Sequence, residues 1–144
     1  MGYDKFRMSE QSERDGIWMP YGDFMVLLAR AGGSNKEFGK ALRKYGKKFE
    51  HLLRLEAVEE EEALAVLRQV YTDTVILDWK VKDNEEWVRG IHDPSDESNI
   101  LPFSRENVLR VLTEMPELFD DIQEQSKTTG WYTQKAREEA GKNS

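Results

Sequence analysis

A long amphipathic helix is the sequence feature that most restricts how this chain can fold. Gly32 and Gly33 precede Ser34-Asn35-Lys36-Glu37, a capping box in which the serine hydroxyl and the glutamate carboxylate satisfy free amides at a helix start. Apolar residues then recur at steps of three and four: Phe38, Ala41, Leu42, Tyr45, Phe49, Leu52 and Leu53. This spacing predicts a helix of about 20 residues with one apolar face, which other elements have to cover.

Three further helices are predicted downstream. One follows the glutamates at 59–62 and carries Leu64, Leu67, Val70, Tyr71, Thr74, Val75 and Asp78-Trp79 on one face. Its second half, residues 72–77, is β-branched and is also compatible with an extended segment. Ser104 is a good cap for a short helix, and Pro116 ends that helix and starts the last one, which buries Leu118, Phe119 and Ile122.

Two segments are predicted to be non-helical. Gly16–Met19 and Phe24–Arg30 flank the turn residues Pro20-Tyr21-Gly22-Asp23, which favours a β-hairpin, although the run from Phe24 does not alternate and also fits a buried helical turn. Asp83–Ile100 is rich in Asp, Glu, Asn, Ser, Gly and Pro, so we predict a long surface loop anchored by Trp87 and Ile91.

These patterns together predict a mainly α fold, a small domain of about four helices with a short N-terminal β-hairpin. Residues 1–15 carry no apolar period and are expected to form a flexible leader. Residues 16–125 would form the single helical domain, including the loop 83–100. Residues 126–144, with Trp131 and Tyr132 as their only large apolar side chains, would form a loosely ordered C-terminal tail.

The composition excludes several classes of protein. The chain has no cysteine, so it has neither a disulfide framework nor a thiolate metal site. Its apolar runs are too short to span a bilayer, which argues against a membrane partner, and its start does not resemble a signal peptide. The net charge of −7 disfavours nucleic acid as a partner, despite a local excess of lysine and arginine between Ser34 and Leu55.

Three segments resemble reactive or ligand-binding sites only weakly. Ala31–Lys36 has the glycines and lysine of an anion site but lacks the Walker spacing, so a bend into a capped helix is the better interpretation. His92–Glu97 lacks the alternating ligands and closing glutamate of a calcium loop. His51 has no nucleophile or carboxylate nearby in the sequence. We therefore predict no catalytic residue, metal or cofactor, and a protein that is not an enzyme.

With these segments placed, the chain resembles the tail assembly chaperones of long-tailed siphophages. The resemblance covers about residues 16–125 and lies in four stretches, residues 30–38, 70–79, 101–108 and 115–122, which read RAGGSNKEF, VYTDTVILDW, LPFSRENV and MPELFDDI. Their order and spacing match, although the segment from Asp83 to Asn99 is longer than the turn expected in that family and the charged leader is additional.

The resemblance implies a non-enzymatic protein that binds the tape measure protein in the host cytoplasm, before tail tube protein polymerises around it, and that is absent from the mature virion. Such a client is a long coiled-coil helix, and an apolar groove on a charged chaperone would shield it. We expect this groove between the helix at 38–53 and the helices at 108–122. The expected partner-binding residues are Tyr45, Phe49, Trp79, Trp87 and Phe119. Self-association around the elongated client is also compatible with this role.

Two other functions fit the sequence. An acidic, compact phage protein also suits an inhibitor of a host protein, with Trp87 and the acidic loop as its binding surface. A structural tail completion or connector subunit is the other alternative, and its presence in purified particles would distinguish it from a chaperone.

Overall fold

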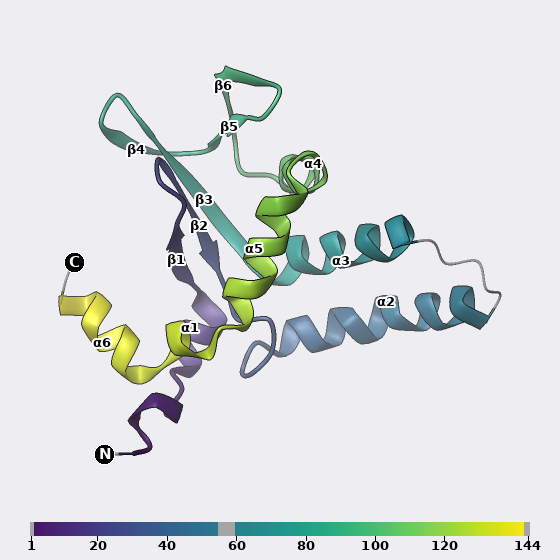
Figure 1. Cartoon of the computed structure of the whole chain (residues 1–144), viewed down its shortest axis with the longest axis horizontal. Coiled ribbons are helices and arrows are strands. Elements are labelled where there is room, and N and C mark those ends of the chain that lie inside the picture. Colours follow the sequence, from purple (N-terminus) through teal and green to yellow (C-terminus); the bar gives the residue numbers. More distant parts are fainter. Residues whose placement is uncertain (1, 55–59, 143–144) are drawn as a thin grey trace.

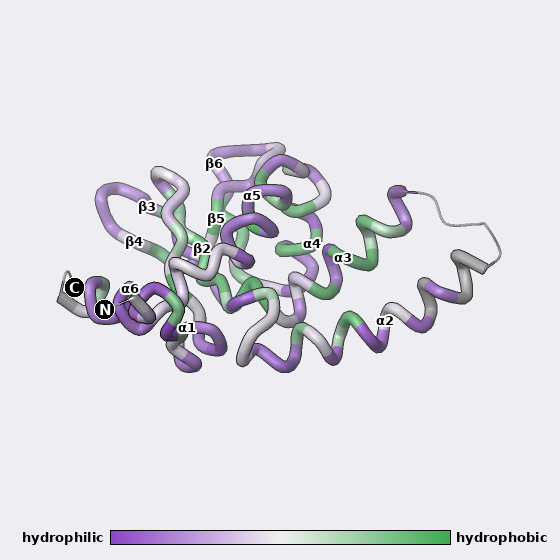
Figure 2. The backbone as a smooth tube through the Cα atoms, turned by 60° about the horizontal axis from the view of Figure 1, so that its bottom comes forward, coloured by the Kyte–Doolittle hydropathy of each residue, from purple (hydrophilic) through white to green (hydrophobic). Residues whose placement is uncertain are grey.

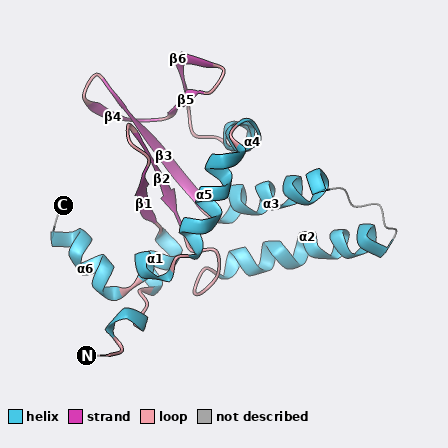
Figure 3. Ribbon diagram, in the orientation of Figure 1, coloured by secondary structure: helices cyan, strands magenta, loops and turns pink. Residues whose placement is uncertain are grey.

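The computed structural model describes residues 2–54 and 60–142 and shows an α+β fold (Figure 3). The first elements are η1 (Asp4–Phe6), α1 (Glu10–Asp15), β1 (Ile17–Pro20), β2 (Phe24–Leu28), α2 (Lys36–Arg54) and α3 (Glu60–Thr74). Then follow β3 (Ile76–Asp83), β4 (Glu86–Arg89), β5 (Ile91–Asp93), β6 (Asp96–Leu101), α4 (Arg105–Glu114), α5 (Pro116–Lys127), η2 (Thr129–Tyr132) and α6 (Gln134–Lys142), as Figure 1 shows. The prediction of a mainly α domain is wrong, because these strands form two antiparallel sheets.

The larger sheet has the strand order β1-β2-β3-β4, and every neighbouring pair is antiparallel. Strands β1 and β2 form the predicted hairpin, with Gly22 at a φ of 82° in its turn. Strands β3 and β4 are joined by Asn84 and Glu85, both at positive φ, as a two-residue hairpin turn requires. The β5-β6 hairpin forms the smaller sheet.

The second predicted helix ends earlier than its apolar pattern suggests. Helix α3 stops at Thr74, and the chain enters β3 at Ile76, so Trp79 lies in a strand. The cause is the β-branched run around Val75, which is stiff in a helix and suits a pleated strand. Pairing with β2 then supplies hydrogen-bond partners across the sheet, and Ala29 N–H donates to the Val75 carbonyl at 2.8 Å.

The segment predicted as a loop over 83–100 contains β4, β5 and β6 instead. These strands are short, and β4 and most of β6 face solvent, so the polar composition of the segment resembles that of a loop. Gly90, at a φ of 153°, forms the bend between β4 and β5, and a Cβ there would lie 2.5 Å from Cγ2 of Ile100. The loop prediction failed because alternation is hard to detect in strands of three to six residues.

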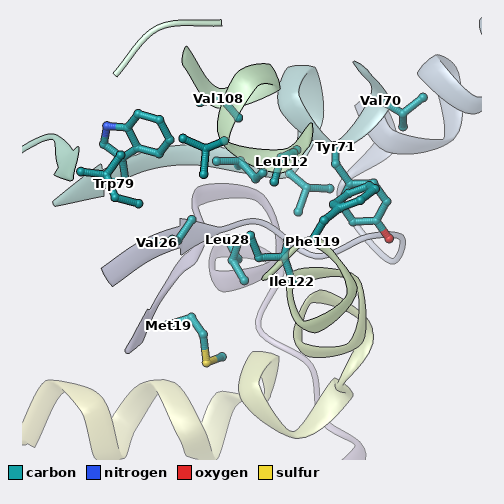
Figure 4. Packing of buried hydrophobic residues seen from close by; sticks show 14 of the residues in the cluster. Met19, Val26, Leu28, Val70, Tyr71, Trp79, Val108, Leu112, Phe119 and Ile122 are labelled. Carbon is teal, nitrogen blue, oxygen red and sulfur yellow. The ribbon is translucent and has the colours of Figure 1, made fainter. Parts of the chain in front are cut away.

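The hydrophobic core lies between one face of the larger sheet and helices α3, α4 and α5 (Figure 4). Val26 and Leu28 of β2 face Val108 and Leu112 of α4 and Ile122 of α5. The sequence predicted α4 and α5 correctly, with the Ser104 cap and the start at Pro116. The Tyr71 ring lies at the centre of this core and meets the rings of Phe38 and Phe119 edge to face, at 5.5 and 5.4 Å.

Both chain ends pack against this body, which differs from the predicted leader and tail. Tyr132 is fully buried, and its hydroxyl donates to the Leu28 carbonyl at 3.1 Å. The Glu13 side chain of α1 is 3% exposed and pairs with Arg30. The two ends also bond each other, because Ser9 N–H donates to the Tyr132 carbonyl at 2.7 Å. The described parts of residues 1–15 and 126–144 are therefore structural elements of the domain.

Candidate functional site

Helices α2 and α3 form an arm that extends away from the sheet (Figures 1 and 2). The two helices lie side by side; Phe38, Val70 and Tyr71 near the sheet belong to the buried core, whereas Tyr45 and Leu64 farther out pack against it only partly buried. We call this helix pair the arm. The arm matters for function because its projecting helices have sides that the rest of the molecule does not cover.

The base of the arm is held firmly. The buried Asn35 side-chain amide donates to the carbonyls of Arg30 and Thr74, at 2.8 and 2.9 Å, and so ties the start of α2 to the end of α3. Helix α2 begins at Lys36. The residue that precedes its first turn is therefore Asn35, one position after Ser34, which the sequence predicted as the cap. On the outer surface, Arg105 Nε donates to Asp73 Oδ1 at 2.8 Å, and the Asp73 carboxylate raises the pKa of Arg105.

Burial decreases along the arm with distance from the body. On α3, Val70 and Tyr71 are fully buried, whereas all residues of Ala63–Leu67 are only partly buried. Five consecutive helical residues point to all sides of a helix, so this apolar stretch Ala-Leu-Ala-Val-Leu contacts water on part of its circumference. On α2, Phe38 is 8% exposed, but Leu42 is 41% exposed.

We call Leu42, Tyr45 and Ala63–Leu67 the arm surface. It is apolar but incompletely covered, which is typical of surfaces that another polypeptide covers. Charges surround it: Lys36, Lys40, Arg43, Lys44 and Lys47 are exposed along α2, and Glu60–Glu62 are exposed at the start of α3. Arg68 donates to Glu61 at 2.8 Å, and this hydrogen bond lowers the pKa of Glu61. The arrangement suits binding of an apolar helix.

The structure does not bring the five predicted partner-binding residues together. Tyr45 lies on the arm, and the side chain of Phe49 is outside the part that the structure describes. Trp79 and Phe119 are each only 2% exposed, packed against Phe103 and Tyr71, so they belong to the core. Trp87 is 44% exposed on β4, at the opposite end of the molecule from the arm (Figure 1).

Helix α3 lies between α2 and α4 (Figure 1), so it occupies the space in which the sequence predicted a groove between α2 and the α4–α5 pair. The apolar face of α2 is thus covered at its base by α3 and the core. Farther out along the arm, its apolar residues are no longer fully covered, and this outer part replaces the predicted groove as the candidate site. Leu64 and Leu67 lie on the packing face of α3, as the sequence predicted, and are partly buried against the core; their position in an arm depends on tertiary structure.

The other sequence candidates have structural roles. Gly32 and Gly33 adopt positive φ in the turn before α2, and Lys36 Nζ donates to the Gly33 carbonyl at 3.2 Å. Asp93 accepts hydrogen bonds from the Ser95 amide and from Arg110, both at 2.8 Å. The His51 side chain lies outside the described residues. Within residues 2–54 and 60–142, no group of three or more metal-ligating side chains occurs.

A row of aromatic and basic side chains on the sheet was not predicted. The Lys80 ammonium lies 4.2 Å from the centre of the Trp18 ring and 5.5 Å from that of Trp87, on the side of β3 opposite the buried Trp79. This row does not follow from the predicted elements because residue 79 was expected in a helix. The alternation of apolar and charged residues in Trp79-Lys80-Val81-Lys82 is the signal that identifies the strand.

A groove of about 720 Å³ lies beside β1 and is lined by residues of α1, β1, η2 and α6 that include Trp18, Trp131 and Ala136. A second, of about 370 Å³, lies between the β5-β6 hairpin and helices α4 and α5. Among the described helices, none combines the length and apolar character that crossing a membrane would require.

Comparison with known proteins identifies a family. The sequence profile of a family described as YdaY prophage protein matches residues 33–143, which include the whole arm and both C-terminal helices α5 and α6. No curated protein and no solved structure matched the chain. Since the match spans most of the 144 residues, the chain belongs to the YdaY prophage protein family and is of phage origin.

Proposed function

We propose that this prophage protein is a non-enzymatic assembly factor, a tail assembly chaperone, which binds a helical segment of the tape measure protein through its arm. The observation that carries the proposal is the arm surface, because Leu42 and the stretch Ala63–Leu67 stay in contact with water on a rigidly anchored pair of helices. Phage origin is consistent with this role.

A helix is the occupant that best suits the arm surface. Two packed helices present a groove along their length, and a third amphipathic helix covers it by inserting its own apolar side chains. Long coiled-coil proteins consist of such helices, which expose apolar residues until they find partners. The lysines of α2 and the glutamates of α3 would keep the complex soluble and select the orientation of the client.

The client and the later steps follow from the resemblance of the sequence to siphophage tail assembly chaperones. In this proposal the protein works in the host cytoplasm, holds the tape measure protein until tail tube protein assembles around it, and is then released. Neither nucleic acid nor membrane is a partner.

The test is co-expression of the full chain with overlapping fragments of the tape measure protein from the same prophage, followed by co-purification. At least one fragment is expected to co-purify. Leu42→Glu and Val66→Glu should each weaken binding about tenfold or more, because each places a charge on an apolar contact. Glutamate is a good helix former, so both variants should fold.

Met115→Glu is the matched control, because Met115 is 43% exposed, close to the 41% of Leu42, but lies between α4 and α5. It should bind like the parent. Failure of every fragment to bind, or equal binding by the Leu42 and Met115 variants, contradicts the proposal. Presence of the chain in purified virions would point to a structural tail subunit, and loss of a host-protein interaction on Trp87 substitution would point to an inhibitor.

A further inference from the structure

The four-stranded sheet has two edges, and only one of them is protected. On β1, Pro20 lacks an N–H group, and helix α6 flanks the strand across the groove that contains Trp18. On the other side, no described strand pairs with the outer edge of β4. Figure 1 shows β4 at the outer border of the sheet, on the side away from the arm.

The register shows which backbone groups of β4 are free. Asp83 and Glu86 flank the two-residue turn, so they form a hydrogen-bonded pair, and alternation makes Val81 and Val88 the next one. The N–H and C=O groups of Trp87 and Arg89 therefore point away from β3. Strand β3 confirms this alternation. Lys82, which lies opposite Trp87, directs its N–H away from β4 and toward β2, where it donates to the Asp23 carbonyl at 2.7 Å.

The side chains of β4 leave this edge accessible. Trp87 is 44% exposed, and its ring lies against the Lys80 ammonium on the open face of the sheet. The Arg89 guanidinium is held along its own sheet, with Nε 2.8 Å from Asp78 Oδ1 and its centre 5.4 Å from the Phe103 ring. Arg89 thus does not cover the edge, although a charged side chain often protects an edge strand.

We propose that β4 pairs antiparallel with β4 of a second copy of this chain, with Val88 at the two-fold axis. In this register Trp87 lies opposite Arg89 of the second copy, and each such pair exchanges two backbone hydrogen bonds. All the outward-facing groups of Trp87 and Arg89 are then satisfied. The sheets of the two copies become one continuous sheet.

Self-complementarity favours a second copy as the occupant. The symmetric register makes Trp87 and Arg89 cross-strand neighbours twice, so that an aromatic residue and a cation that is paired with Asp78 of its own sheet share one face. On the other face, Val88 meets Val88 of the second copy, and Glu86 lies opposite Gly90, so no like charges oppose each other. Centring on Trp87 instead would require Glu85 to pair, but its φ of 67° places it in the turn.

The experiment is sedimentation velocity of the full chain over a range of concentrations, combined with amide hydrogen exchange by NMR. The parent should form a dimer, in which the Trp87 and Arg89 amides become protected as the concentration rises, whereas Val88 is protected throughout. Trp87→Pro removes an N–H that points away from β3, so β4 should persist while self-association weakens about tenfold or more.

Trp131→Ala is the control, because Trp131 has a similar exposure of 46% but lies beside the groove at β1. It should dimerise like the parent, and so should Leu42→Glu, which separates this proposal from the arm. A parent that is monomeric at all concentrations overturns the proposal. A dimer that persists in Trp87→Pro, or that leaves the Trp87 and Arg89 amides unprotected, also overturns it.

Discussion

At the scale of single residues, Asp93 joins the β5-β6 hairpin to helix α4. Its side chain is 8% exposed and accepts the Ser95 amide and Arg110 Nη2, each at 2.8 Å. The hydrogen bond from the Ser95 amide, followed by the charge and hydrogen bond of Arg110, lowers the pKa of Asp93. The ionised carboxylate is thus a structural group of this corner.

The lowered pKa predicts a pH dependence. A carboxyl group with a lowered pKa in the folded state stabilises the fold above its unfolded pKa, and this contribution is lost as pH falls through the folded pKa. Asp93→Asn should therefore be less stable than the parent at neutral pH, and this difference should shrink below about pH 4 and vanish only once the pH falls below the lowered pKa of Asp93. Urea unfolding at both pH values measures this. Asp96→Asn, an exposed carboxylate bonded only to Ser98, should change stability much less at either pH.

At the scale of elements, sequence patterns predict long amphipathic helices well. Helices α2, α4 and α5 and the β1-β2 hairpin appear where capping residues, Pro116 and the Gly22 turn indicate them. The failure lies at Thr74 and beyond, where the apolar pattern of α3 continues into β3 without interruption. The alternation from Trp79 to Lys82 indicates a strand only after this run, and pairing with β2, which joins residues about fifty positions apart, fixes where the strand begins.

Helix α2 contains a glycine, Gly46, that should lower the stability of the protein, and an alanine substitution there can measure this effect. Gly46 lies inside the helix, and a Cβ there would meet no atom within 4 Å. Gly46→Ala should therefore raise the free energy of unfolding by about 0.5–1 kcal/mol, since alanine loses less backbone entropy in a helix. Denaturant unfolding measures the change.

Gly33→Ala is the opposite control. Gly33 adopts a φ of 53°, and a Cβ there would overlap the buried Glu13 carboxylate, which pairs with Arg30. This substitution should destabilise the protein. A stabilising effect of Gly33→Ala, or no effect of Gly46→Ala, would show that the turn or the helix is packed differently.

At the scale of the whole molecule, the proposed site depends on tertiary structure more than on motif. The sequence analysis proposed Trp79 and Phe119 as partner-binding residues, but both are buried, and they are large and apolar because they fill the core. The arm surface is apolar for a different reason, since its residues follow the same helical period as buried ones. A sequence pattern cannot show at which residue of a helix the packing against the rest of the domain ends. In α3, full burial gives way to partial burial between Val70 and Leu67.

The two ends of the chain complete the domain, and this leads to the last prediction. Tyr132 is buried with its hydroxyl on the Leu28 carbonyl, burial raises its pKa so that it stays protonated, and its carbonyl accepts the Ser9 amide. The family match also continues to residue 143. A chain of residues 16–125, the domain expected from sequence alone, lacks all these contacts and should lose cooperative unfolding.

The size of the effect follows from the burial. Truncating a fully buried aromatic residue costs about 3–5 kcal/mol, which is a large part of the roughly 5–15 kcal/mol that stabilises a typical domain. Thermal unfolding followed by circular dichroism distinguishes the cases, with a chain that ends at Thr133 as the control. That control keeps Tyr132 and lacks α6, whose described residues are mostly exposed, so it should unfold cooperatively. Cooperative unfolding of residues 16–125 at the parent's midpoint would mean that the two ends contribute no stability, and it would contradict the structural role assigned to their buried contacts.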